Sequence, residues 1–328
     1  MRRASASWCW PMIGLVLAGC ASSQKGAPET IRVEEVSRPP ATPMVLQGER
    51  LLSEGRPEEA LRVFRQAVAD DPQDARAWLD VGLASEGVGD TASAEQAYRR
   101  ATDIDPRFPD PFNNLGVLLR EAGKLEQAID MLERAAAIDP AHAAVRFNLA
   151  LAYEDRGRLE DAEREYRAAI ERLPSDPVPR INLAMMLLAM GRPDDAATEL
   201  RAARPMVRRD VLLSIVVGEG LRRAGFPEEA VPVLRNALEL AAEPPPTELL
   251  AELALAQYAT GDLESAEETM RRALRQDELD PALQYAYGSI LAKRGDFGKA
   301  RAHLRRAIEL DPDGPYADRA RARLEAIK

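Results

Sequence analysis

The sequence repeats every 34 residues from Ala41 onward, and this period constrains the fold more than any other feature. Alanine fills the twentieth position of each unit, and the eighth position is always glycine or alanine. Glycine fills the fifteenth position of all eight units: Gly55, Gly89, Gly123, Gly157, Gly191, Gly225, Gly261 and Gly295. Glycine readily adopts the left-handed conformation that ends a helix, and small residues let two helices approach closely. Each unit is therefore predicted to be a helix–turn–helix pair.

Larger residues complete the pattern of each unit. A bulky side chain at the twenty-fourth position is expected to fill the space between units: Phe64, Tyr98, Leu132, Tyr166, Leu200, Leu234, Met270 and Leu304. Proline is expected to stop the second helix, because it cannot continue the hydrogen-bonding pattern: Pro72, Pro106, Pro140, Pro174 and Pro312. Ala162, at the twentieth position, is predicted to lie at a tight helix crossing, whereas Glu163 in the same helix is predicted to be exposed.

The second unit carries the residues by which the sequence resembles the tetratricopeptide repeat family: Trp78, Val81, Gly82, Ala94, Tyr98 and Pro106. Eight such units span residues 41–314. The resemblance implies an all-α fold, a right-handed α-solenoid of about eight helix–turn–helix repeats. Residues 315–328 resemble the extra helix that closes such arrays, in which Tyr316, Ala320, Leu324 and Ile327 would cover the last repeat.

The N-terminal residues 1–19 have the features of a signal peptide. Arg2 and Arg3 precede an apolar run of 12 residues from Trp8 to Gly19, which is too short to span a bilayer. The run ends in Leu-Ala-Gly-Cys, which resembles the lipobox of bacterial lipoproteins. That resemblance implies that Cys20 is acylated, with diacylglycerol and palmitate. The alternative is an ordinary secretory leader that contains a cysteine by chance.

The residues after the predicted cleavage site suggest where the protein resides. Residue 21 is alanine rather than aspartate, which by resemblance to proteobacterial lipoproteins implies the outer membrane, with the protein facing the periplasm. Residues 20–40 carry serine, glycine, proline and charge without an apolar period, so they are predicted to be a lipidated cysteine and a disordered tether. Cys9 would leave with the leader, so no disulfide is expected.

Charge and motif searches exclude several function classes. The formal net charge is −10 and no long basic run occurs, which disfavours nucleic-acid binding. The only two histidines, His142 and His303, lie at no metal-ligand spacing. No nucleophile elbow or phosphate-binding glycine loop is present. We therefore expect no enzymatic activity, catalytic residue, cofactor, metal or small-molecule substrate.

The family resemblance implies that the first helix of each repeat lines a concave groove for a peptide or protein. The predicted partner-binding residues lie at its fifth, sixth and ninth positions: Asn114, Asn148, Asn182, Phe147, Leu151, Ile181, Met185 and Ile215. The apolar members would form a groove floor, and the three asparagines would hold the backbone of a bound peptide. Alternatively, the asparagines tie neighbouring helices together.

The pattern becomes irregular between residues 203 and 247, where the usual Asp-Pro stop is replaced and a two-residue insertion occurs. This stretch is either a hinge between two halves or loop drift. It also contains or adjoins a basic cluster, which is either a site for an acidic partner or lipid headgroups or a solvated loop: Arg201, Arg204, Arg208 and Arg209.

These features predict a lipid-anchored interaction scaffold of the bacterial envelope. In design it resembles the repeat lipoproteins that pilot pilus secretins or serve envelope assembly. The alternative is a regulatory module that presents substrates to a catalytic partner, such as a transferase or a cell-wall enzyme.

Overall fold

The computed structural model describes residues 39–327, which form seventeen α-helices and no strand within that range. The all-α fold predicted from the sequence is therefore confirmed. The chain divides into two compact units, whose described parts are residues 39–174 and 175–327. The predicted signal peptide, Cys20 and nearly all of the tether lie outside the described residues.

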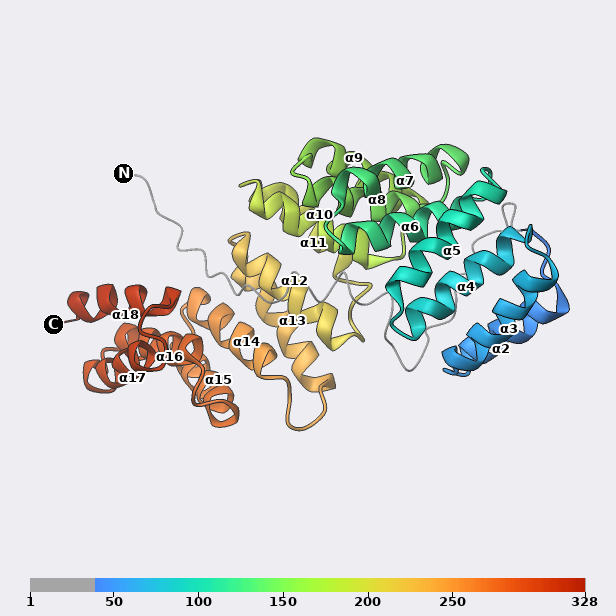
Figure 1. Cartoon of the computed structure of the whole chain (residues 1–328). Coiled ribbons are helices and arrows are strands. Elements are labelled where there is room, and N and C mark those ends of the chain that lie inside the picture. Colours follow the sequence, from blue (N-terminus) through green and yellow to red (C-terminus); the bar gives the residue numbers. More distant parts are fainter. Residues whose placement is uncertain (1–38, 328) are drawn as a thin grey trace. The chain divides into compact units, whose positions relative to one another are not determined.

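The unit 39–174 consists of four helix pairs, coloured blue to green in Figure 1. Their bounds are α2 (Pro43–Ser53), α3 (Pro57–Asp70), α4 (Ala75–Gly87), α5 (Thr91–Ile104), α6 (Pro109–Glu121), α7 (Leu125–Ile138), α8 (Ala143–Asp155) and α9 (Leu159–Arg172). Each first helix packs most extensively on its own second helix, and α3, α5 and α7 pack next on the first helix of the following pair. This packing of neighbours in sequence is that of a helical solenoid.

The unit 175–327 contains four further pairs and a final single helix (Figure 1). Their bounds are α10 (Pro177–Ala189), α11 (Pro193–Ala203), α12 (Val211–Arg223), α13 (Pro227–Leu240), α14 (Thr247–Thr260), α15 (Leu263–Gln276), α16 (Pro281–Arg294), α17 (Phe297–Leu310) and α18 (Pro315–Ala326). Helix α18 packs on α17 and α16, and its Tyr316 and Ala320 are buried. Leu324 and Ile327 are partly buried against the last repeat.

Local sequence signals set the helix ends. Aspartate side chains accept hydrogen bonds from backbone N–H groups at seven helix starts: Asp74, Asp90, Asp176, Asp210, Asp262, Asp280 and Asp296. These bonds satisfy donors that a helix start otherwise leaves unpaired. All eight glycines at the fifteenth position have positive φ, between 72° and 93°. The predicted left-handed glycine after each first helix is therefore confirmed.

The bulky residue at the twenty-fourth position packs inside its own repeat. An ideal Cβ added to Gly82 would lie 2.2 Å from the Tyr98 ring, and one added to Gly48 would lie 2.3 Å from the Phe64 ring. The absent side chain at the eighth position therefore makes the space that the large one fills. The same side chains also join core clusters with the following repeat, Phe64 with Val81 and Tyr98 with Leu115. Leu200 likewise reaches Gly220 of the following repeat. The expectation that they fill the space between units is confirmed for these residues.

The irregular stretch replaces a short connector with a longer one. Helix α11 ends at Ala203, and residues 204–210 lead to α12, with Val207 buried at 1% exposure. Helix α13 continues through Pro232. The division between the two compact units does not fall in this stretch but at residues 174 and 175. Whether residues 203–247 act as a hinge stays a prediction.

The predicted exposure of Glu163 is wrong. This residue is buried at 8% exposure, whereas Ala162 beside it is completely buried as expected. Arg167, one turn later in α9, lies 2.5 Å from the Glu163 carboxylate. A buried carboxylate needs a charged or hydrogen-bonding partner of this kind, and the repeat pattern alone does not reveal it.

Candidate partner-binding site

The eight predicted groove residues fall equally in the two units. Helices α6 and α8 carry four of them in unit 39–174: Asn114, Phe147, Asn148 and Leu151. Helices α10 and α12 carry the other four in unit 175–327: Ile181, Asn182, Met185 and Ile215. All are on first helices, as the repeat pattern requires.

In unit 39–174 the asparagines form a hydrogen-bonded chain. Asn148 donates from Nδ2 to the Oδ1 of Asn113 at 2.9 Å, and Asn113 donates to the Oδ1 of Asn114 at 3.1 Å. The chain therefore links α8 to α6. Asn113 was missed by sequence reasoning, although the doubled asparagine at the fifth and sixth positions of this repeat was a visible signal.

The third predicted asparagine has a different bond. Asn182 donates from Nδ2 to the backbone carbonyl of Val178, four residues earlier in α10, at 2.9 Å. This bond lies within one helix and ties no repeats together. Among the described residues, nothing donates to the Oδ1 of Asn148 or of Asn182. Both side chains are half-buried, so each keeps an acceptor that a peptide N–H group can use.

The apolar residues of the predicted groove differ in accessibility. Ile181 and Ile215 are buried, at 0% and 4% exposure, so they are core residues here and offer no surface to a partner. Phe147, Leu151 and Met185 are half-buried. The ring of Phe147 lies 5.9 Å from the Tyr166 ring, between centroids. Contact of these three residues, and of the asparagines, with a partner stays a prediction.

Two buried tyrosines tie the helices of their repeats together. The hydroxyl of Tyr166 donates to Glu154 at 2.6 Å, and the hydroxyl of Tyr98 donates to Glu86 at 2.5 Å. Burial raises the pKa of both carboxyl groups, and the tyrosine hydrogen bonds act in the opposite direction. The pKa of Tyr98 is raised by burial first and by the charge of Glu86 next.

In unit 175–327, equivalent first-helix positions carry charges that sequence reasoning missed. Arg222 of α12 and Glu252 of α14 form an ion pair at 2.8 Å, with side chains only 8% and 7% exposed. Glu219 pairs with Arg223 at 3.2 Å, and its Oε2 atom is buried without a hydrogen-bond partner in the described structure. Burial and the nearby Glu252 raise the pKa of Glu219. The signal was a carboxylate at the ninth and sixth positions, where the third, fourth and fifth repeats have apolar and amide residues.

The two histidines have structural contacts. His142 caps α8 and lies 3.5 Å from Asp110, and His303 contacts Gln284 at 2.8 Å. Within residues 39–327, no three His, Cys, Asp or Glu side chains are grouped as metal ligands. No helix in that range is long and apolar enough to cross a membrane.

Known families match most of the chain. Residues 33–211, more than half of the chain, match the family described as "Cilia and flagella-associated protein 70 C-terminal domain". Residues 218–281 and 251–315 match the family described as "Tetratricopeptide repeat". None of the curated protein sequences matches this chain significantly.

Several solved structures are similar to this chain. The Cut9–Hcn1 heterotetramer of APC/C is 17% identical, with a TM-score of 0.53 over 87% of this chain. This chain spans 55% of the length of the Cut9–Hcn1 chain it matches. The thermophilic repeat protein TTC0263 of Thermus thermophilus is 25% identical over 54% of this chain and 97% of its own, with a TM-score of 0.45. YrrB, "a TPR protein with an unusual peptide-binding site", is 19% identical over 70% of this chain and 100% of its own, with a TM-score of 0.45.

The helix pairs, the left-handed glycines and the family matches all indicate the same repeat fold. Proteins of this repeat fold typically act as non-catalytic scaffolds that bind peptides or other proteins. The chain belongs to the tetratricopeptide repeat family.

Proposed function

We propose that this protein is a lipid-anchored adaptor at the periplasmic face of the bacterial outer membrane. The observation that carries the anchor is the sequence Leu17-Ala18-Gly19-Cys20, which follows an apolar run of signal-peptide length. The repeats would bind a peptide or protein partner and help to assemble or localise an envelope complex, such as a pilus secretin.

Partner binding is supported by the first helices. The half-buried Asn148 and Asn182 each keep an amide acceptor, and Phe147, Leu151 and Met185 offer partly open apolar surface beside them. Acceptors beside apolar surface suit an extended or helical peptide, whose N–H groups need partners when it leaves water.

The anchor is tested by labelling cells with a palmitate analogue. We expect the wild-type chain to take up label and to fractionate with the outer membrane. Cys20→Ala should remain an unprocessed precursor without label, whereas the matched control Cys9→Ala should behave as wild type. Label that persists in Cys20→Ala would exclude the lipoprotein assignment.

The binding surface is tested by placing a photo-crosslinking residue at position 151 in cells. A crosslinker at Leu151 should give a discrete adduct with an envelope protein, and Asn148→Ala should weaken that adduct. The same crosslinker at the exposed Glu160 of α9 should not give it. Equal adducts at both positions would contradict a specific site on the first helices.

A further inference from the structure

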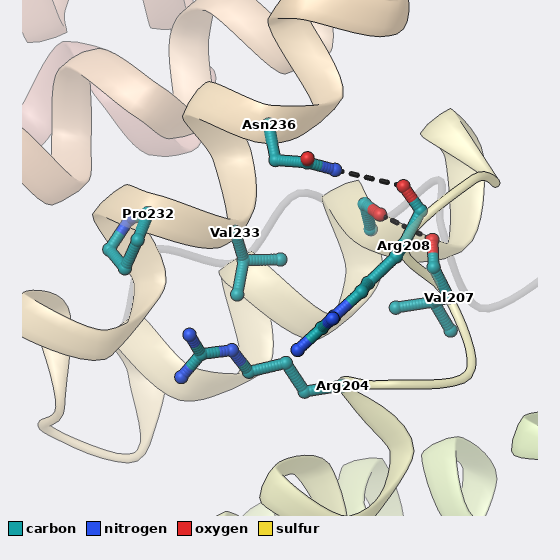
Figure 2. Close-up of a pocket in the computed structure, with 7 residues that line it drawn as sticks. Arg204, Val207, Arg208, Pro232, Val233 and Asn236 are labelled. Carbon is teal, nitrogen blue, oxygen red and sulfur yellow. Dashed lines mark hydrogen bonds between the residues drawn. The ribbon is translucent and has the colours of Figure 1, made fainter.

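A small pocket opens within unit 175–327, between the connector 204–210 and helix α13. Its volume is about 240 Å³. Figure 2 shows the side chain of Arg208 running toward Arg204 alongside Val233, with Pro232 and Asn236 on the facing helix. The pocket is formed by a connector and second-helix residues, together with Ser214 of α12. It is therefore separate from the first-helix groove residues described above.

The walls of the pocket are held in place. Val207, Ser214 and Val233 are buried, at 1%, 1% and 7% exposure. The Ser214 hydroxyl donates to the Val207 carbonyl at 2.8 Å, and Asn236 donates from Nδ2 to the Arg208 carbonyl at 2.8 Å (Figure 2). These two bonds fasten the connector to α12 and α13. The backbone that carries the Arg208 side chain is therefore positioned before any ligand arrives, which lowers the entropy cost of binding.

The structure separates the predicted basic cluster into paired and unpaired arginines. Arg201 forms an ion pair with Glu229 at 2.7 Å and lies over the Phe226 ring. In contrast, the guanidinium groups of Arg204 and Arg208 form no hydrogen bond or ion pair with any described residue. Arg204 acts on Glu229 only through its charge. The pKa of Glu229 is lowered mainly by the hydrogen bond from Arg201 and less by the charge of Arg204.

Two unpaired guanidinium groups beside one cavity define the class of ligand. They present planar arrays of N–H donors that fit a carboxylate or a phosphate. The volume is below the roughly 300–1,000 Å³ of ordinary small-molecule sites, so it suits one or two side chains rather than a cofactor.

Exposed apolar residues adjoin the pocket in sequence. Met206 lies in the connector and is 37% exposed, and Leu212 lies in the first turn of α12 and is 56% exposed. Such side chains favour a polypeptide, which can place an apolar residue next to an acidic one. We propose that the Arg204–Arg208 pocket binds an aspartate or glutamate side chain of a partner polypeptide, as a second contact beyond the first-helix surface.

The proposal is tested by NMR titration of the isotopically labelled whole chain. The probe is a short blocked peptide, Leu-Asp-Glu-Leu, and its neutral counterpart is Leu-Asn-Gln-Leu. The acidic peptide should shift the amide signals of residues 204–214 and 233–236. The neutral peptide should bind at least about tenfold more weakly, because it cannot form charge-assisted hydrogen bonds.

Matched variants assign the effect to the two arginines. Arg204→Gln with Arg208→Gln should weaken acidic-peptide binding by about tenfold or more. It should leave the melting temperature nearly unchanged, because neither guanidinium group donates a hydrogen bond within the described structure. Arg209→Gln is the control, since Arg209 is exposed in the same connector and does not line the pocket; it should bind nearly as wild type.

Four results would overturn the proposal. These are equal binding of the neutral peptide, unchanged binding by the double variant, and no shift up to about 10 mM acidic peptide. The fourth is stronger binding of inorganic phosphate or of phosphatidylglycerol vesicles through the same arginines, which would assign the pocket to phosphate groups. The outcome is independent of the first-helix surface, because none of these variants changes it.

Discussion

Two polar networks on first helices, one in each unit, differ in charge. In unit 39–174 helices α6 and α8 share a network of neutral amides, in which Asn148 donates to Asn113 and Asn113 donates to Asn114. In unit 175–327 helices α12 and α14 share a charged network, with Arg222 bonded to Glu252. One repeat pattern therefore accommodates two kinds of polar network on equivalent helices. The neutral network costs little to bury once it is hydrogen-bonded, whereas the ionic one depends on every charge keeping its partner.

The largest effect is expected from breaking the ionic network. Glu252→Ala leaves the guanidinium of Arg222 buried without its carboxylate, which should destabilise the protein by about 3–5 kcal/mol. Replacing both residues, as Arg222→Met with Glu252→Leu, should restore most of that loss because no charge is then left unpaired. Urea unfolding measures both. A double variant as unstable as the single one would show that the pair acts through packing rather than charge.

The helix crossings provide a control that both units share. Ala162 and Ala230 occupy the twentieth position in different units, and both are completely buried. Leucine at either position should therefore cost a similar amount, about 1–3 kcal/mol, because added bulk strains a packed crossing. Glu160 in α9 is exposed, so Glu160→Leu should change stability by less than about 0.5 kcal/mol. If only one of the two leucine variants lost stability in thermal unfolding, the two crossings would not be equivalent.

A smaller difference is expected between two asparagines. Asn148→Ala removes the hydrogen bond to the preceding repeat and leaves Asn113 with an unused acceptor, which should cost about 1 kcal/mol. Asn182→Ala removes only a bond within α10, and its effect should be smaller. Melting temperatures of the two variants test this order. A larger loss of melting temperature in Asn182→Ala would show instead that Asn182 contributes more to stability than Asn148.

The smallest effect concerns pH. The pKa of Glu219 is raised by burial and by Glu252, against the opposing charges of Arg223 and Arg222. The folded state therefore holds this proton more tightly than the unfolded state, and ionised Glu219 costs stability at neutral pH. Glu219→Gln should be slightly more stable than wild type at about pH 7, and this advantage should shrink on acidification toward the ordinary glutamate value.

The pH prediction also separates the two networks. No titratable side chain belongs to the Asn148–Asn113–Asn114 chain, so the effect of Asn148→Ala should change little over the same pH range. Urea unfolding at several pH values measures both variants. An advantage of Glu219→Gln that grows on acidification would contradict the sign derived from the raised pKa.

The sequence predicted the helices well because their signals are local. Glycine at the fifteenth position and alanine at the twentieth act within one helix pair, and the structure places both as expected. The depth of individual side chains was harder to predict. Ile181 and Ile215 were expected on a surface and are core residues, because burial there depends on how closely neighbouring helices approach. A 34-residue period does not contain that information.

The candidate site was predicted only in part for the same reason. The repeat pattern assigned Asn114, Asn148 and Asn182 to equivalent positions, yet their bonds differ. Asn182 donates to the backbone of its own helix, whereas Asn148 donates to Asn113 of the preceding repeat. Equivalent positions in a repeat thus fix where a side chain starts, and the particular neighbours decide which atom it bonds.

The pairing of the eighth and twenty-fourth positions has a consequence for how such a chain can be lengthened. Gly82 and Tyr98 complement each other within one repeat, as do Gly48 and Phe64. A repeat that is duplicated or deleted therefore keeps its internal fit of small and large residues. Its fit to its neighbours is a separate requirement, because Leu200 packs against Gly220 of the next repeat and a Cβ added to Gly87 would lie 2.8 Å from Pro57 of the preceding one. A copied repeat has to match the flanking residues at each new junction.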